Sequence, residues 1–348
     1  MALLIAEGFD DLVTGRARSL LNKRYFNGAF VEDSDLSTSS TGTRYSSGRR
    51  TNTTNYEFVR WNLGGEKQEV YYCSQLRRAT AAAENIFLTF QDGALSSPQI
   101  RFGITGAGDF KVYRGTSTQI GSTVSSTFTI ATWYWISIYI KIDSVAGRVV
   151  VYLDGNQIFD FTGNTQATEN AAISKIYWEQ AITSIIDHDD IIIMDPTGSA
   201  PYNGHLLVPR RIITLNVTGA GTDGDLAAST GSPFQCVDEI QYNDDTDYIW
   251  TSMPHEKSSF VMADLPPAAL QVEAVFCSSR HRRDETLPRN ARLYMRSGGT
   301  AYPDDEDFEI PAAYTARLGK LHLVNPATSA AWTPSEVNGV EAGIELRS

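Results

Sequence analysis

Hydrophobic residues in this chain recur with a period of two along many short segments. In the clearest segment, 133–142, four isoleucines occupy alternate positions, Ile136, Ile138, Ile140 and Ile142. Successive side chains of a strand point to opposite faces of a sheet, so this pattern predicts one strand face of isoleucine that is buried. The opposite face carries Trp135, Ser137, Tyr139 and Lys141 and is suited to partial contact with water.

Two more strands are predicted directly after this segment. Residues 144–147 form a turn, and Arg148-Val149-Val150-Val151-Tyr152-Leu153 continues as a strand. Asp154-Gly155-Asn156 is then a turn signal before the alternating run Gln157-Ile158-Phe159-Asp160-Phe161. The sequence therefore predicts an antiparallel meander of three strands.

Turn residues recur about every 8–12 residues along the chain, a spacing typical of a β-sandwich or jelly roll. Further strands are predicted over residues 85–92, 99–105, 109–114, 125–130, 173–179 and 190–195, with weaker patterns at 25–30, 56–61 and 69–75. Residues 35–54 are rich in Ser, Thr and Gly and predict a long loop.

The chain is expected to form two domains, since ~150 residues per domain is usual and Pro and Gly concentrate at residues 195–204. We place the boundary so that residues 1–203 form a jelly-roll domain and residues 204–348 a second β-sandwich domain. In the second, strands are expected at 205–217, 270–277, 290–296 and 320–324, and a loop at 218–233. Thr333-Pro334-Ser335-Glu336 predicts a helix start with Val337, Val340 and Ile344 as its apolar stripe, so the fold class is all-β with a short C-terminal helix.

Composition and charge narrow the class of function. The formal net charge is −12, which disfavours nucleic acid as a partner because an acidic surface repels phosphate. The three cysteines, Cys73, Cys236 and Cys277, are far apart in sequence and are expected to be buried thiols. The N-terminal residues do not resemble a signal peptide, and no run of ~18 apolar residues predicts membrane insertion. We expect a protein made in a cytoplasm without a signal peptide.

A group of carboxylates precedes the apolar run Ile191-Ile192-Ile193-Met194. Asp187, Asp189 and Asp190 supply the hard oxygen atoms that Ca²⁺ prefers, so they are candidate calcium ligands and Ca²⁺ is the one candidate cofactor. The other interpretation is that they are turn and edge residues that solvate the entry of a strand.

Two charged runs occur in the second part of the chain. Residues 243–248 are acidic and predict a solvated turn, because they lack the glycine and distal glutamate of a calcium loop. Residues 280–283 are basic and are followed by Asp284-Glu285, which predicts an ion-paired hairpin tip.

Candidate contact residues are the large aromatic side chains Trp135, Tyr139 and Trp178, which can stack on a sugar ring or contact another subunit. Their alternative role is packing in the core. No catalytic residue is predicted, because the five histidines are scattered and neither a nucleophile elbow nor a phosphate-binding glycine loop occurs.

The first part of the chain resembles the concanavalin A-like (laminin G-like) jelly roll. The resemblance is carried by residues 133–142, the hairpin from Arg148 to Gly155 and the strand from Asp189 to Asp195, with residues 7–11 and 27–30 similar to the first strands of that family. Glucanases of this fold carry a strand with an alternating Glu-x-Asp-x-(x)-Glu pattern. No strand here has that pattern, so we expect a protein that is not an enzyme.

The second part resembles the segment that follows such domains in structural proteins of tailed bacteriophages. Val237-Asp238-Glu239, the acidic run 244–248 and residues 325–333 with 337–343 carry this resemblance. It implies a virion component of the tail, baseplate or fibre that forms a homo-oligomer and contacts other virion proteins, with a host-surface glycan as a further partner. The alternatives are a carbohydrate-binding adsorption module, a capsid decoration protein and a polysaccharide depolymerase.

Overall fold

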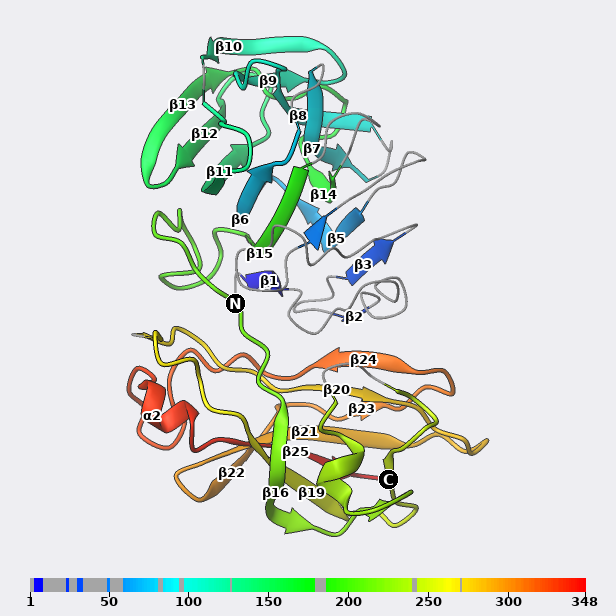
Figure 1. Cartoon of the computed structure of the whole chain (residues 1–348). Coiled ribbons are helices and arrows are strands. Elements are labelled where there is room, and N and C mark those ends of the chain that lie inside the picture. The colour runs from blue at the N-terminus through cyan, green and yellow to red at the C-terminus, as the bar shows by residue number, and fades with distance from the viewer. Residues whose placement is uncertain are drawn as a thin grey trace. The chain divides into compact units, whose positions relative to one another are not determined.

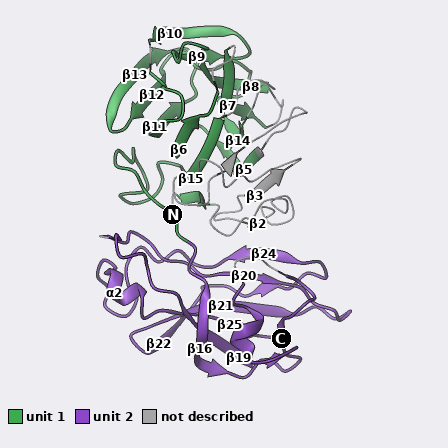
Figure 2. Ribbon diagram, viewed as in Figure 1, with its two compact units in different colours: residues 1–213 green, residues 214–348 purple. Residues whose placement is uncertain are grey.

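The computed structural model describes residues 3–8, 23–24, 30–33, 49–50, 59–80, 84–93, 97–125, 127–178, 186–239, 243–269 and 271–348 (Figure 1). The chain divides into two compact units, residues 1–213 and 214–348 (Figure 2). Both units are built from β-strands, which confirms the expected all-β class.

One antiparallel sheet of the first unit contains the predicted meander, and we call it the β11 sheet. Its strand order is β1, β15, β6, β11, β12, β13, and β4 pairs with β15 outside this path. The strands are β1 (Leu3–Glu7), β4 (Arg49–Arg50), β6 (Glu69–Arg78), β11 (Trp133–Lys141), β12 (Gly147–Leu153), β13 (Asn156–Gly163) and β15 (Ile186–Met194). The meander β11–β12–β13 is confirmed.

The other sheet of the first unit is also antiparallel, and its strands follow the order β10, β9, β8, β7, β14, β5, β3, β2. They are β10 (Thr118–Val124), β9 (Phe110–Arg114), β8 (Ser97–Ile104), β7 (Asn85–Asp92), β14 (Ile173–Trp178), β5 (Val59–Lys67), β3 (Phe30–Asp33) and β2 (Lys23–Arg24). The chain crosses between the sheets at β5–β6, β6–β7, β10–β11, β13–β14 and β14–β15, as a sandwich requires.

Aromatic rings fill the interior of this sandwich. Tyr72 of β6 meets Phe90 of β7 with ring centroids 6.2 Å apart, and Phe110 of β9 meets Phe159 of β13 at 6.2 Å. The four isoleucines of the 133–142 segment are fully buried, as their alternation predicts. Contacts between rings of opposite sheets place the main core between the two layers.

The second unit contains one six-stranded antiparallel sheet and two short strand pairs among its described residues. The sheet has the order β16, β19, β25, β21, β22, with β23 paired to β21. Its strands are β16 (Val217–Gly224), β19 (Lys257–Met262), β21 (Asn290–Ser297), β22 (Thr300–Pro303), β23 (Phe308–Glu309) and β25 (Glu341–Leu346). The pairs are β17 (Ala227–Ala228) with β18 (Ile249–Trp250), and β20 (Ser278–His281) with β24 (Thr315–Leu318).

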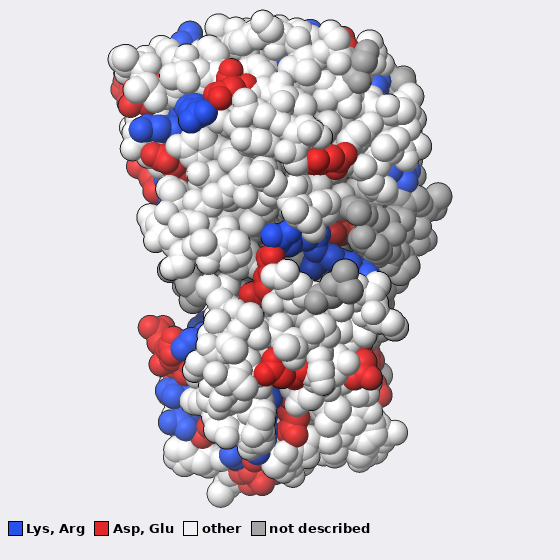
Figure 3. All heavy atoms as spheres, turned by 90° about the vertical axis from the view of Figure 1, so that its left-hand side faces the viewer, with Lys and Arg blue, Asp and Glu red and all other residues white. Residues whose placement is uncertain are grey.

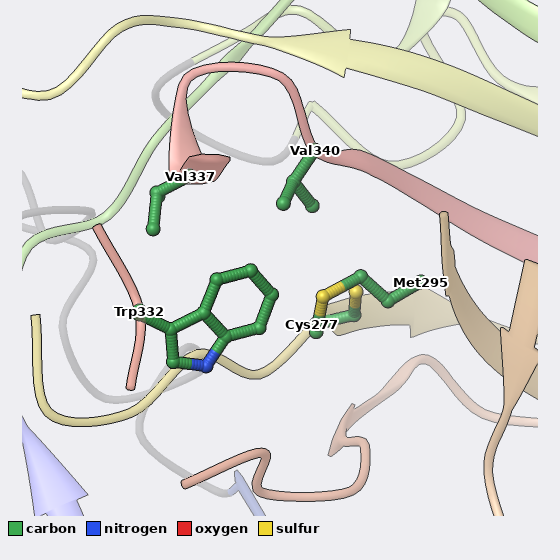
Figure 4. Close-up of a cluster of buried hydrophobic side chains, with 5 residues drawn as sticks. All are labelled: Cys277, Met295, Trp332, Val337 and Val340. Carbon is green, nitrogen blue, oxygen red and sulfur yellow. The ribbon is translucent and has the colours of Figure 1, made fainter. Parts of the chain in front are cut away.

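A core cluster of the second unit joins its sheet to its helix. Figure 4 shows Cys277, Met295, Trp332, Val337 and Val340, all less than 10% exposed, facing one another. The helix α2 (Pro334–Val337) begins at the predicted position, where the Thr333 side chain accepts a hydrogen bond from the Glu336 backbone N–H. Ile344 lies in β25 rather than on the helix, so that part of the expected apolar stripe is wrong.

Several boundaries differ from the sequence expectation for identifiable reasons. The strand expected at 125–130 is wrong: Phe128 is buried in an irregular segment, where its ring packs against Phe110 and Tyr134. The strand β16 lies in the expected loop 218–233, because a Gly- and Thr-rich strand can pair through its backbone without an apolar pattern. Gly221 permits this approach, since an added Cβ would lie 2.6 Å from the Ser259 carbonyl.

Other expected strands reduce to single contacts. The expected strand 205–217 lacks strand structure before Val217. Of 270–277 and 320–324, the described residues form one bridge, Val275 with His322. The loop at 35–54 and the strand at 25–30 fall almost wholly outside the described residues.

The boundary between the two units lies between residues 213 and 214, whereas the sequence predicts one between residues 203 and 204. Residues 204–213, which we call the covering segment, pack on the β11 sheet. Leu206 is buried there, and Ile212 N donates to Asp190 Oδ1 at 2.8 Å. The Pro- and Gly-rich stretch therefore precedes a segment that still belongs to the first unit.

Candidate functional site

Two of the three predicted contact residues are buried. Trp135 and Trp178 are 1% and 2% exposed. Trp178 lies inside the sandwich, stacked on His188 with centroids 4.1 Å apart, and Trp135 Nε1 donates to the Leu206 carbonyl at 2.6 Å. Neither ring can stack on an external sugar or contact another subunit in this structure, so their predicted contact role is wrong. Tyr139 is half-buried and remains a candidate.

The three predicted calcium ligands are buried on β15 and bind protein groups. Arg77 Nε lies 3.2 Å from Asp187 Oδ2, Asp190 N donates to Asp189 Oδ1 at 2.9 Å, and Asp190 accepts from Ile212 as described above. Their exposures of 3%, 2% and 1% also contradict the solvated-turn interpretation. Among the described residues, no group of three or more His, Cys, Asp or Glu side chains is placed to hold a metal ion. The calcium hypothesis therefore has no supporting geometry in that part of the chain.

The covering segment divides the outward face of the β11 sheet into two halves. Over Trp135 and Ser137 the face is closed, because His205 and Leu206 lie against them. Both side chains are fully or almost fully buried, although β-sheet alternation places them opposite the isoleucines. Toward Tyr139 and Lys141 the side chains become half-buried, which leaves an open half.

An aromatic cluster stands at the edge of this open half. Tyr71 of β6, Tyr139 of β11 and Tyr152 of β12 surround His205, with centroids 5.3, 6.2 and 4.6 Å from the imidazole. Tyr71 and Tyr139 are cross-strand partners whose rings lie 4.8 Å apart. All four rings are half-buried, so each keeps part of its surface in contact with solvent. We call these four residues the tyrosine platform.

Charged side chains next to the tyrosine platform occur as pairs of opposite sign. Tyr139 Oη donates to Glu69 Oε2 at 2.7 Å, and Lys141 Nζ lies 3.8 Å from Glu69 Oε1. Arg148 forms a two-point contact with Asp160, at 3.2 and 2.9 Å. Figure 3 shows one face of the molecule, on which basic and acidic side chains occur in small groups separated by wide areas without charged residues.

The protonation states of the platform favour hydrogen bonding. Burial lowers the pKa of His205 to about 4, with the Arg148 charge adding to this effect, so the imidazole is neutral at pH 7. Burial and the Glu69 carboxylate raise the pKa of Tyr139, and burial raises that of Tyr71. Both tyrosines therefore remain protonated donors at neutral pH.

Ser137 links the platform to the closed half. Its Oγ lies 2.9 Å from His205 Nδ1 and 3.3 Å from the Cys73 thiol, whose pKa burial raises to about 11. A chain of thiol to hydroxyl to neutral imidazole thus fixes the His205 ring. Ser137 is fully buried, which makes it a positioning group and prevents attack on a bound ligand.

In the second unit, the acidic and basic runs of the sequence neutralise each other. Arg280 makes a two-point contact with Asp244 at 2.5 and 2.8 Å, and Arg282 lies 2.7 Å from Asp245. Both guanidinium groups lie 5.0 Å from the centre of the Tyr314 ring. The expected ion pairing of the basic run is confirmed, but these partners come from the acidic run 36 or more residues earlier rather than from Asp284-Glu285.

No protein-family model and no curated protein matches the sequence, whereas solved structures show a distant likeness. A sialidase has TM-score 0.39 and 11% identity over 57% of this chain and 19% of its own. The alginate lyase Aly36B has TM-score 0.38 and 14% identity over 55% and 96%, and the binding domain of Paraclostridial Mosquitocidal Protein 1 has 0.39 and 13% over 56% and 48%. The chain spans about a fifth of the sialidase and half of the mosquitocidal domain. The described residues contain no helix of the length and apolar character that crossing a membrane requires.

Proposed function

We propose that the first unit binds a polysaccharide on the open half of the β11 sheet, and that the chain is a non-enzymatic attachment component of a bacteriophage particle. The observation that carries the binding proposal is the tyrosine platform with its adjoining ion pairs. Partly exposed aromatic rings offer an apolar face to the C–H groups of a sugar, while their polar ends remain hydrated.

The adjoining polar groups match a ligand rich in hydroxyls. Glu69 and Asp160 accept hydrogen bonds from the Tyr139 hydroxyl and from Arg148, and the Lys141 ammonium group lies beside Glu69. A hydroxyl both donates and accepts, so it can satisfy either kind of group without leaving a charge unpaired. The pairs are fixed by the strands beneath them, which reduces the ordering that binding requires.

The same geometry gives little basis for catalysis. A tyrosine that acts as a base needs a lowered pKa, and the pKa of Tyr139 is raised. The His205 imidazole faces the buried Ser137 hydroxyl through Nδ1, and the pKa of about 4 makes it a weak base. Binding without bond cleavage is therefore the proposed activity of this face.

The placement in a virion rests on the sequence resemblance of residues 237–248 and 325–343 to bacteriophage structural proteins. Assembly as a homo-oligomer and contact with other virion proteins belong to the same proposal. Many copies of the chain in purified particles are the expected result, and its absence from them would refute the placement.

A glycan array tests the binding proposal. The array includes neutral glucans and mannans, uronate polymers and cell-wall fragments, and the readout is retained full-length protein. We expect Tyr139→Ala to weaken binding at least tenfold and Tyr139→Phe to weaken it less, because the ring remains. Tyr113→Ala is the matched control, since Tyr113 also donates to a glutamate, Glu84, but lies on β9 of the other sheet. Lack of binding to every glycan, or equal losses for Tyr139→Ala and Tyr113→Ala, would overturn the proposal.

A further inference from the structure

Two large aromatic side chains of the second unit are exposed two residues apart, one in the short strand β18 and the other just before it. Tyr248 is 43% exposed and Trp250, in β18, is 53% exposed, and Met253 three residues later is 60% exposed. Within the described residues, neither aromatic ring has a ring contact, cation–π contact or side-chain hydrogen bond. The other tryptophan of this unit, Trp332, is 3% exposed in the core.

The β17–β18 pair holds these two rings on one face. Trp250 lies opposite Ala227, and Tyr248 is joined to Ser229 by two hydrogen bonds of 2.9 Å. Side chains at positions i and i+2 of a strand lie on the same face ~7 Å apart. Their cross-strand neighbours are small, so nothing across the pair shields the rings.

The pair is fixed to the rest of the second unit. Asp225 N donates to the Lys257 carbonyl at 2.9 Å, and Leu226 N donates to Ser258 Oγ at 3.0 Å. Leu226 and Cys236 are buried, at 8% and 3% exposure. The exposed rings are thus held on an ordered element anchored to β19.

We propose that Tyr248 and Trp250 form a second carbohydrate-binding site, which takes a neutral glycan chain lying along β18. The size of the patch favours this ligand over a protein partner. A stable protein interface buries about 800 Å² on each side, whereas a large aromatic side chain supplies about 150–250 Å² even when it is fully exposed beforehand. Two half-exposed rings fall short of that area but can cover the faces of two sugar rings.

Charge excludes the acidic ligands. The second unit contains 10 Lys and Arg residues against 20 Asp and Glu residues. A polyanion, whether a nucleic acid or a uronate polymer, is repelled by such a unit. A neutral glycan carries no such penalty and uses the apolar faces of the rings.

This site is independent of the tyrosine platform, because all its residues belong to the second unit. A chain with two glycan sites gains avidity on a surface that presents many copies of the ligand. The second site therefore adds to the proposed attachment role but does not depend on it.

Calorimetric titration of the full-length protein with cellohexaose, laminarihexaose, mannohexaose and chitohexaose tests the site. The test protein carries Tyr248→Ala and Trp250→Ala, and the matched control carries Leu287→Ala and Val324→Ala, two residues that are 65% and 46% exposed in the same unit. All four positions are exposed, so both proteins are expected to fold, and circular dichroism checks this.

We expect at least a tenfold loss of affinity for one or more of these sugars in the test protein and less than a twofold change in the control. The same loss is expected in a Tyr139→Ala background, which separates this site from the tyrosine platform. An unchanged affinity in the test protein, or no binding of any of the four neutral sugars to the unmodified chain, would overturn the second site. The proposal for the first unit is tested separately, by the Tyr139 variants on the wider glycan array.

Discussion

The β11 sheet of the first unit and the six-stranded sheet of the second unit each have one face that does not enter the core. The side chains on these two faces are stabilised in different ways. In the first unit, the β11 sheet is covered by aromatic rings and by the covering segment, and Trp135 and Ser137 are buried beneath it. In the second unit, the face of the six-stranded sheet opposite its apolar core carries a network of ion pairs. Arg296 lies 3.2 Å from Asp223 and 3.6 Å from Glu341, and Lys257 lies 3.2 Å from Asp223.

This difference indicates which contacts stabilise each unit and which of the two faces can bind a ligand. A covered aromatic face removes apolar area from water, which is worth ~25 cal/mol per Å². A face of ion pairs gains less, because the attraction between two charges is offset by the hydration they lose, and salt also screens the more exposed pairs, such as that of Lys257 with Asp223. The half-open first face leaves rings and donors accessible, whereas the second face satisfies its charges internally.

Removal of Trp135 should give the largest effect. Trp135→Ala leaves a cavity and breaks the hydrogen bond to Leu206, so we expect a loss of about 3–5 kcal/mol in the free energy of unfolding measured with urea. The covering segment should also open, and trypsin should cleave faster after Arg210 and Arg211. Trp250→Ala, at an exposed ring, should change stability by less than ~0.5 kcal/mol. Equal effects of the two substitutions would contradict the view that the first face is covered.

Gly343→Ala should disturb the second face by an intermediate amount. An added Cβ would lie 2.2 Å from the Tyr294 ring, which rests over Gly343. The hydroxyl of Tyr294 donates to Asp223 Oδ2 at 3.0 Å. We expect a loss of about 1–3 kcal/mol from this overpacking, measured by urea unfolding. Gly224→Ala is the control, because no atom lies within 4 Å of its added Cβ. If Gly343→Ala leaves the free energy of unfolding unchanged, the Tyr294 ring can move aside without cost and the overpacking argument is wrong.

Acid should weaken the first unit through His205. The pKa of this residue is about 4 in the fold and about 6.5 when it is unfolded, so between these values the unfolded chain binds a proton that the folded chain does not. Stability is therefore complete above pH 6.5 and declines as the pH falls toward 4, by on the order of 1–2 kcal/mol after allowance for solvent screening.

Hydrogen exchange of β11 and β12 peptides between pH 7 and 4, corrected for the intrinsic rate, measures this decline. His205→Gln should flatten it in the first unit. The second unit should keep its decline, since burial also lowers the pKa of His281 to about 4. If His205→Gln leaves the pH dependence of exchange in the first unit unchanged, groups other than His205 cause its acid sensitivity.

The smallest effect is expected for an exposed ion pair. Asp307 Oδ1 lies 2.5 Å from Arg292 Nε and 3.5 Å from Arg347 Nε, and Asp307→Asn should cost less than ~1 kcal/mol. Molar salt should abolish the difference, because it screens the pair in the unmodified protein. Asp160→Asn, which removes the Arg148 pair of the first unit, should behave alike. A cost above 2 kcal/mol that persists in salt would show that the second face depends on its charges.

The sequence by itself determined the elements whose pattern is strong. Alternation in residues 133–142 identified β11 and its buried isoleucines, and the turn at Asp154-Gly155 fixed the meander. Thr333 and Glu336 marked the start of α2, since a capping box needs only residues three apart. These features depend on neighbours in sequence, which is why they could be predicted.

Only the tertiary structure decided what covers each face. Alternation shows that Trp135 lies opposite the isoleucines, but not that residues 204–213 return over it. The burial of Asp187, the meeting of Tyr71, Tyr139 and Tyr152 around His205, and the exposure of Trp250 have the same origin. Each depends on contacts between segments far apart in the chain. Such contacts contribute to the free energy of folding but produce no periodic pattern of residues in the sequence.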